Sequence, residues 1–256
     1  MASAFDLTTS LIASSCRGWR GAASFTPATR QPEKLLELYD IEASPYCRLV
    51  REVLSELDID AMIYPCPAEG TRFRPRVQEL GGKQQFPFLV DPNTGDKLYE
   101  SADIVDHLRL AYGNGKPASR GLGRQLGIVG SYAATVSRAI GRIRGMRARP
   151  SRAPEQPLEL YSFEASPYSR PVRELMTELQ LPYRLRNFAK SRWEEMGPPA
   201  VRGKFFPDAP LTSPNRIRMK ELTGRSQVPY LIDPNTGTAM YESSDILRYL
   251  EQAYAL

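Results

Sequence analysis

The spacing of apolar residues changes between two periods within residues 35–113. Apolar and polar side chains alternate over residues 36–39, which is typical of a short strand. Over residues 45–57 the apolar positions follow the period of a helix that buries one face. The same criteria predict strands at 61–64, 86–90 and 97–99, and then a helix from 101 to 112. The predicted order is therefore βαβ, a helical or irregular link, and ββα.

Capping and turn residues mark the ends of these elements. Ser44 and Pro45 are typical of a helix start, with serine at the N-cap and proline at the first helical position. Asp91-Pro92-Asn93-Thr94-Gly95 is a turn sequence, so the strands on either side of it are expected to form a hairpin. Ser101 is expected to cap the final helix.

The whole pattern occurs twice in the chain. Residues 36–54 and 158–176 are identical at 13 of 19 positions. Residues 87–104 and 229–246 are identical at 12 of 18 positions. Two such blocks in the same order indicate a duplicated unit. The sequence therefore predicts an α/β protein with two tandem domains of the thioredoxin-like order βαβ–ββα.

We expect an N-terminal extension at 1–34, a first domain at 35–113, a linker at 114–156 and a second domain at 157–256. The offset between the copies grows from 122 residues in the first block to 142 in the second. The extra residues form an insertion at about 188–214, rich in proline and glycine, which predicts an ordered loop over the surface or over a site.

The linker predicts a basic amphipathic helix. Its apolar positions recur at intervals of three and four: Leu122, Leu126, Val129, Ala133, Val136, Ile140 and Ile143. We expect this face to pack between the two domains. The alternative is that residues 120–149 bind an anionic membrane surface or an acidic partner.

The net charge of +5 is concentrated in the same region. Residues 113–157 hold one acid, Glu155, and these nine basic residues: Lys116, Arg120, Arg124, Arg138, Arg142, Arg144, Arg147, Arg149 and Arg152. The segment carries +8 and the remainder of the chain −3, so we expect no nucleic-acid partner. No apolar run approaches the ~18 residues of a membrane span, so no transmembrane segment is expected.

Two interpretations fit residues 1–31, which are rich in Ser, Ala and Thr. Their charged residues are Asp6, Arg17, Arg20 and Arg30. This composition is typical of an organellar transit peptide and favours the chloroplast stroma, with the cytosol as the alternative. The other interpretation is an ordered arm with a helix capped by Asp6 or Thr8. The apolar residues that it would pack on a domain are Phe5, Leu7, Leu11 and Ile12.

Cysteine and histidine are scarce. The chain has Cys16, Cys47, Cys66 and a single histidine, His107. This excludes a disulfide-built fold, fits a reducing compartment and gives no reason to expect a metal site. Cys47 is interpreted as a core residue, with a catalytic thiol or a redox pair with Cys66 as alternatives.

Three motifs recur in both copies in the same order. They are Ser44-Pro45-Tyr46-Cys47 with Ser166-Pro167-Tyr168-Ser169, Phe86-Pro87 with Val228-Pro229, and Glu100-Ser101 with Glu242-Ser243. Through them each copy resembles the glutathione-binding N-terminal domain of a glutathione transferase and, more distantly, a glutaredoxin. The resemblance covers residues 35–112 and 157–255. It is specific for the superfamily and not for a class.

The resemblance implies roles for the first two motifs. In the family the first residue of the first motif lies at a helix N-terminus and does the chemistry. Ser44 and Ser166 would thus hydrogen-bond the thiolate of glutathione and lower its pKa, unless they serve only as N-caps. Pro87 and Pro229 would follow cis peptide bonds, which are rare and usually purposeful. In the family the residue before this proline, here Phe86 or Val228, pairs with the cysteinyl part of glutathione.

The third motif would bind the γ-glutamyl end of glutathione. The helix N-terminus and the hydroxyl of Ser101 or Ser243 would hold its carboxylate, and Glu100 or Glu242 would face its ammonium. A helix cap alone is the alternative. A further pair, Lys83 and Arg225, would meet the glycine carboxylate or remain solvated.

Charged residues also repeat on the first helix of each copy. Arg48 and Glu52, like Arg170 and Glu174, are four residues apart, and Arg51 matches Arg173. We expect this spacing to give a paired, solvated face.

The copies depart from transferases in two ways. Within this sequence neither copy is followed by the helical domain that supplies the second-substrate pocket, and the first motif begins with serine. We expect a glutathione-binding, transferase-like protein that uses the thiolate in conjugation or peroxide reduction with an unidentified second substrate. The alternatives are a non-catalytic binding or scaffold protein and thiol transfer through Cys47.

Overall fold

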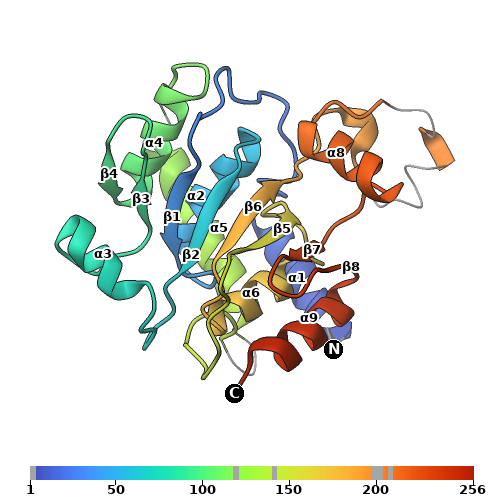
Figure 1. Ribbon diagram of the computed structural model, residues 1–256. Coiled ribbons are helices and arrows are strands. Elements are labelled where there is room, and N and C mark those ends of the chain that lie inside the picture. The colour runs from blue at the N-terminus through green and yellow to red at the C-terminus, as the bar shows by residue number, and fades with distance from the viewer. Residues whose placement is uncertain (1–3, 118–120, 140–142, 198–203, 207–209) are drawn as a thin grey trace.

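The computed structural model describes residues 4–117, 121–139, 143–197, 204–206 and 210–256 (Figure 1). The first repeat contains β1 (Leu36–Asp40), α2 (Pro45–Glu56), β2 (Ala61–Pro65), α3 (Arg74–Gly81), β3 (Phe88–Val90), β4 (Lys97–Tyr99) and α4 (Ser101–Ala111). The second contains β5 (Leu158–Ser162), α6 (Arg170–Glu178), β6 (Tyr183–Asn187), η1 (Trp193–Glu195), α8 (Pro214–Thr223), β7 (Tyr230–Asp233), β8 (Thr238–Tyr241) and α9 (Ser243–Tyr254). Both follow the predicted βαβ–ββα order of the thioredoxin-like fold.

The two repeats share one sheet. Strand β2 pairs antiparallel with β6, which gives the order β4-β3-β1-β2-β6-β5-β7-β8 in the described part of the chain. One apolar cluster extends beneath both halves, with Leu38 and Val53 from the first and Leu160 and Met176 from the second. The repeats are therefore joined through backbone hydrogen bonds and a common core, in addition to the linker.

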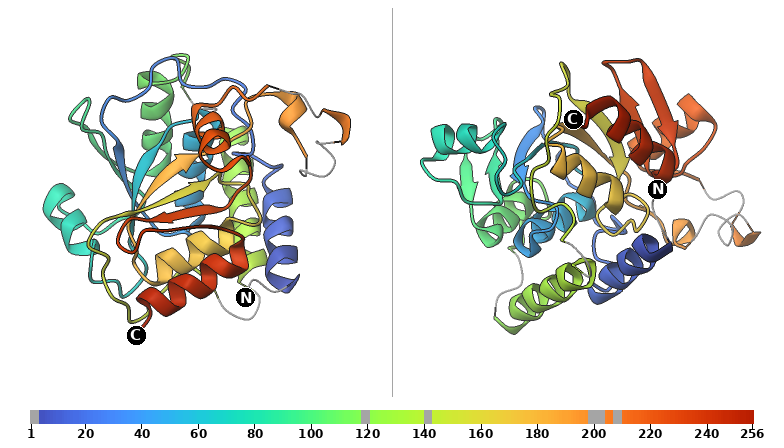
Figure 2. Two further views of the ribbon diagram at one scale, coloured as in Figure 1. Left: turned by 45° about the vertical axis from the view of Figure 1, so that its right-hand side comes forward. Right: turned by 90° about the horizontal axis from the view of Figure 1, so that it is seen from below.

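Two further helices, α1 (Ala4–Cys16) and α5 (Leu122–Arg138), form an outer layer over α2 and α6 (Figure 2). Each precedes one repeat in the chain and covers the other. From α5, the hydroxyls of Ser131 and Thr135 donate to backbone carbonyls at the start of α2, at 2.7 and 3.0 Å. From α1, the hydroxyl of Ser14 donates to the Ala165 carbonyl before α6, at 2.9 Å.

These outer helices are themselves a duplicated element, which the sequence analysis did not find. Residues 10–17 and 131–138 share the pattern Ser-x-x-Ala-(Ser/Thr)-x-x-Arg. The final arginines have matching ion pairs: Arg17 bonds Glu52 of α2 at 2.6 Å, and Arg138 bonds Glu174 of α6 at 2.8 Å. The repeated unit thus begins about 30 residues before the first strand of each copy.

The outer helices are oriented opposite to the expectation from their apolar residues. The described members of the apolar series on α5, Leu122, Leu126, Val129, Ala133 and Val136, are exposed, as are Phe5, Leu11 and Ile12 of α1. The buried positions are small or polar, such as Ser10, Ser14, Ser131 and Ala134. The reason is that this face makes polar contacts: the hydroxyls of Ser14 and Ser131 donate to carbonyls beside α6 and α2, and the Ser10 carbonyl accepts from Arg170. Arg120, Ile140 and Arg142 lie outside the described residues.

The expectation of a solvated face on α2 and α6 is wrong. Arg48, Arg51, Arg170 and Arg173 are all 1–2% exposed. The outer helices cover Arg48 of α2 and Arg170 of α6. Arg48 donates to the Ser131 carbonyl, and Arg170 donates to the Ser10 carbonyl.

The other two arginines cross between the repeats. Arg51 of the first repeat bonds Glu164 of the second at 2.8 Å, and Arg173 of the second bonds Glu42 of the first at 2.9 Å. All four side chains are buried. The centre of the molecule is consequently a buried ion-pair network that both repeats build.

Much of the linker's positive charge has partners within the chain. Arg138, Arg144, Arg147 and Arg149 pair with acids elsewhere: Glu174, Asp6, Glu69 and Glu251. The charge separation noted in the sequence therefore reflects internal ion pairs. No helix in the described ranges combines the length and apolar character needed to cross a membrane.

Candidate functional site

The second and third motifs meet in each copy. The Gln85 side chain, just before Phe86, donates to the Glu100 carboxylate, and Gln227 donates to Glu242 at 3.2 Å. These glutamines were not among the site residues predicted from the sequence, although they match across the repeat directly before Phe86-Pro87 and Val228-Pro229. Each copy thus holds a glutamate beside the start of its third strand.

The peptide bonds Phe86–Pro87 and Val228–Pro229 are both cis. The two prolines are buried, and the residues before them are half-buried. The motif therefore has the same backbone form in both copies.

Glu100 and Glu242 have an unusual backbone conformation. Their φ angles are 62° and 65°, in the left-handed region that non-glycine residues seldom adopt. Each occupies the N-cap position of the following helix, so Ser101 and Ser243 are the first helical residues rather than caps. Both serines are buried and both glutamates are exposed. This backbone directs a carboxylate to solvent beside a helix N-terminus, where backbone N–H groups attract anions.

Ser44 is the N-cap of α2, as predicted. Its hydroxyl oxygen accepts from the backbone N–H of Cys47 at 3.3 Å, and the side chain is half-buried. Ser166 differs because it is 1% exposed and accepts from both the N–H and the hydroxyl of Ser169, at 3.1 and 2.9 Å. The first residue of the motif is therefore open in one copy and enclosed in the other.

Cys47 is poorly suited to catalysis. It is fully buried, and its sulfur accepts from the Ile41 N–H at 3.5 Å. Burial and the nearby Asp40 carboxylate raise the pKa of its thiol to about 12. Burial also raises the pKa of the Cys66 thiol, and neither cysteine is in a disulfide. Both sulfurs are thus protonated near neutral pH.

The basic pair suggested for the glycine carboxylate lies on the surface. Lys83 is exposed, with its ammonium 4.5 Å from the centre of the Tyr99 ring. Arg225 is exposed too, 5.8 Å from the Tyr241 ring. Each therefore stacks on the residue immediately before the glutamate of its own copy.

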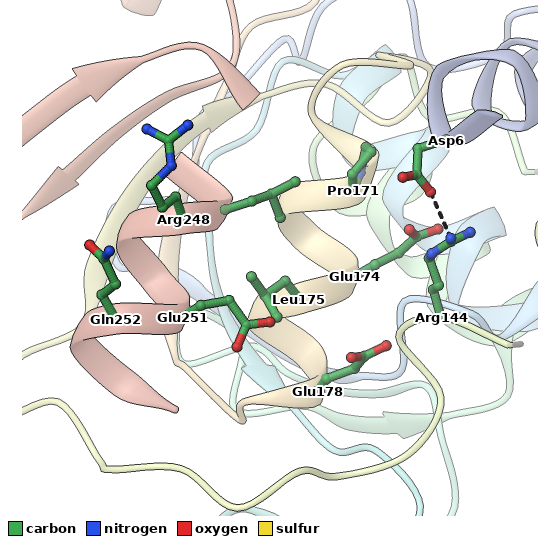
Figure 3. A pocket seen from close by; sticks show the side chains of 10 residues that line it. Asp6, Arg144, Pro171, Glu174, Leu175, Glu178, Arg248, Glu251 and Gln252 are labelled. Carbon is green, nitrogen blue, oxygen red and sulfur yellow. Dashed lines mark ion pairs between the residues drawn. The ribbon is translucent and has the colours of Figure 1, made fainter. Parts of the chain in front are cut away.

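A cleft of about 360 Å³ lies between α6 and α9, and none of its lining residues belongs to the three motifs (Figure 3). Pro171 and Leu175 line it together with several carboxylates. Those of Asp6, Glu174 and Glu251 pair with Arg144, Arg138 and Arg149. Its acidic rim is thus matched by arginines of this chain.

A family model described as glutathione S-transferase, N-terminal domain, matches the chain over residues 38–117 and 160–256. The two matches contain both copies of every motif. No curated protein and no solved structure matches the chain.

Proposed function

Because this chain belongs to the family of glutathione S-transferase N-terminal domains, we propose that it binds glutathione and stabilises the glutathione thiolate with a motif serine. The second substrate of this transferase-like chemistry is an electrophile or a peroxide.

The glutamate that begins the last helix of each repeat carries the proposal. Gln85 holds Glu100, and Gln227 holds Glu242, beside the start of the third strand. An exposed carboxylate next to a helix N-terminus complements an α-amino acid, because the carboxylate attracts the ammonium and the helix attracts the acid. The γ-glutamyl end of glutathione has both groups on one carbon.

Ser44 supplies the step at sulfur. Its oxygen accepts from the Cys47 N–H, which leaves the hydroxyl proton available for a ligand thiolate. The N-terminus of α2 adds a positive potential, so the thiolate is favoured over the thiol. The raised pKa of Cys47 argues against the alternative of thiol transfer through that residue.

Calorimetry and ultraviolet titration of bound glutathione test this proposal. The unsubstituted protein should bind glutathione and lower the pKa of its thiol, and Ser44→Ala should bring that pKa back toward the free value. The Ser101→Ala, Ser243→Ala double variant should lose roughly ten- to hundredfold in affinity, since a hydrogen bond to a charged group contributes about 1.5–3 kcal/mol. Absence of binding by the unsubstituted protein would contradict the proposal.

A non-catalytic scaffold is the second candidate, and the enclosed Ser166 favours it for the second repeat. Turnover assays with an aryl halide and with an organic peroxide distinguish the two candidates. Binding without turnover in either assay supports the scaffold.

We also propose the stroma of a plastid as the compartment, because the composition of residues 1–31 favours it; the bonds of α1 to the second repeat require that these residues stay on the mature chain. Imaging of a C-terminal fluorescent fusion tests this, with the cytosol as the contrary outcome.

Anionic vesicles, added in a sedimentation assay, test whether the linker region binds a membrane surface.

A further inference from the structure

We infer that glutathione binds to the first repeat alone, with Arg74 holding its glycine carboxylate. In the second repeat, the equivalent arginine and serines are bonded to other residues of that repeat. This inference rests on the proposed function. It follows from three differences between copies that otherwise share sequence and backbone.

The first difference concerns a pair of arginines at the start of α3 and α8. Arg74 and Arg216 are 142 residues apart, the offset of the second sequence block. Each guanidinium stacks on an aromatic ring at 4.7 Å, but the rings differ. Arg74 lies over Phe86, the residue before the cis-proline, whereas Arg216 lies over Phe188. Only the first therefore sits beside the residue whose backbone would pair with the cysteinyl part of glutathione.

Their partners differ as well. Arg74 is half-buried and donates to three neutral oxygens: the carbonyls of Cys66 and Pro67, at 3.0 and 3.2 Å, and the Gln84 side chain, at 3.3 Å. None of the ion pairs found among the described residues involves it. Arg216 is 2% exposed and donates to the Glu195 carboxylate at 3.1 Å. Arg74 thus keeps its charge for an external carboxylate, and Arg216 does not.

The insertion in the second repeat causes this difference. Glu195 belongs to η1, lies within the extra residues at about 188–214, and is itself 1% exposed. A buried, hydrogen-bonded pair of this kind is costly to separate, so a ligand does not compete for Arg216. The insertion therefore supplies internally the carboxylate that we assign to glutathione in the first repeat.

The motif serines follow the same trend. Ser166 is enclosed and bonded to Ser169, whereas Ser44 is half-buried. The Ser243 hydroxyl donates to the Tyr168 carbonyl at 2.8 Å, and the Ser101 hydroxyl makes no comparable bond within the described ranges. In the second copy the serine hydroxyls and the arginine charge thus have partners within the chain. In the first copy, Ser101 has no such bond among the described residues, and Arg74 has hydrogen bonds to neutral groups but no ion pair.

Calorimetry on the full chain, with glutathione and with its glycine monoethyl ester, tests the inference. The unsubstituted protein should bind one glutathione per chain and should bind the ester more weakly, because the ester lacks the glycine charge. Arg74→Gln should weaken glutathione binding by roughly ten- to hundredfold and leave the affinity for the ester unchanged. Arg76→Gln, an exposed neighbour on α3, is the matched control and should change neither affinity.

The outcomes separate the two claims. No binding of either ligand contradicts the proposed function. A stoichiometry of two contradicts the assignment to one repeat. An equal loss for glutathione and for its ester in Arg74→Gln means that Arg74 only supports Phe86, and this overturns its role as the carboxylate partner. Thermal melting of each variant confirms that the comparison is made on folded protein.

Discussion

Glu42 and Glu164 are single residues on which the junction between the repeats depends. Each lies in the loop before the first helix of its repeat and bonds an arginine of the other repeat. Burial alone would raise the pKa of Glu164, but Arg51 and Arg173, with further help from Arg170, hold it at about 2. The buried carboxylate is therefore charged throughout the neutral range.

Glu164 should give the protein a stability that is lost in acid. Its folded pKa is below the ordinary value of 4.5, so its contribution is full above about pH 4.5 and falls as the pH drops toward 2. Glu164→Gln should lower the free energy of unfolding at pH 7 by about 3 kcal/mol, because it removes the carboxylate that pairs with Arg48, and Arg51 and Arg173 keep only acids of the first repeat. Urea unfolding between pH 2.5 and 7 measures both effects, with the exposed Glu33→Gln as control. A parallel pH dependence in Glu164→Gln would contradict this assignment.

Cys47 should be chemically inert in the folded protein. Burial raises the pKa of its thiol to about 12, so thiolate is scarce at pH 8, and the sulfur is out of reach of solvent. Iodoacetamide at pH 8 should therefore label the exposed Cys16 and spare Cys47 and Cys66, whereas all three react in urea. Mass spectrometry counts the labels. Stoichiometric labelling of Cys47 in native protein would restore the thiol-transfer alternative.

Sequence identity located the motif residues but misjudged the arginines beside them. Ser44, Glu100 and their copies stand in blocks that are identical at 13 of 19 and 12 of 18 positions, so the repeat identified them directly. Arg48 and Arg170 each lie four residues before a glutamate. This spacing occurs on buried and on exposed helix faces, so it could not show that these arginines are buried. Their burial depends on distant helices that no local pattern places.

At the level of elements, the strands and the helices of the repeats were predictable, and the outer helices were not. Helices α1 and α5 bury serines and alanines and expose leucine, valine and phenylalanine. A periodicity argument assigns the apolar face to the interior, which is wrong wherever hydroxyls are needed to bond carbonyls. The shared Ser-x-x-Ala-(Ser/Thr)-x-x-Arg pattern was the available indication of their role.

The α1 arm should be required for stability. Arg17 bonds Glu52 of α2 at 2.6 Å, and Glu52 is fully buried. Arg17→Met should therefore destabilise the protein by about 3 kcal/mol, the low end of the cost of removing one partner of a buried ion pair, since the buried Glu52 keeps only Arg20 as a partner, at 3.7 Å. The Arg17→Met, Glu52→Leu double variant should recover part of that loss. Urea unfolding measures the stability of both variants, with Arg30→Met at an exposed position as the control. Equal stability of Arg17→Met and the unsubstituted protein would exclude a structural role for the arm.

At the scale of the whole molecule, the second repeat has every strand and helix of the βαβ–ββα order, but it shares its sheet and its buried ion pairs with the first repeat. Its sequence suggests a domain able to fold alone from about residue 155. In the structure, its strand β6 pairs with β2, and its Arg173 needs Glu42 of the first repeat. The sequence could not show this, because strand edges and buried charges look the same whether or not a partner strand is present.

The two halves should therefore fold together. A fragment of residues 155–256 should lack a cooperative unfolding transition, because it takes Glu42 from Arg173 and Arg51 from Glu164, and it exposes the shared core. Fragments 1–117 and 118–256, expressed together, should associate and restore cooperative unfolding. Size-exclusion chromatography and thermal melting measure both results. A cooperative transition in the 155–256 fragment alone would show that the repeats are independent.

Because each outer helix covers the other repeat, α1 is synthesised well before the helix on which it packs. The bond between Arg170 and the Ser10 carbonyl joins residues 160 positions apart. At the usual ribosomal rate of about 5–20 residues per second, α1 emerges roughly 8–32 s before the helix that it covers. During that interval α6, on which α1 packs, has not been made, and the edge of β2 that pairs with β6 is open. Such an intermediate exposes apolar surface and an open strand edge, so it is prone to aggregate until the second repeat has been translated.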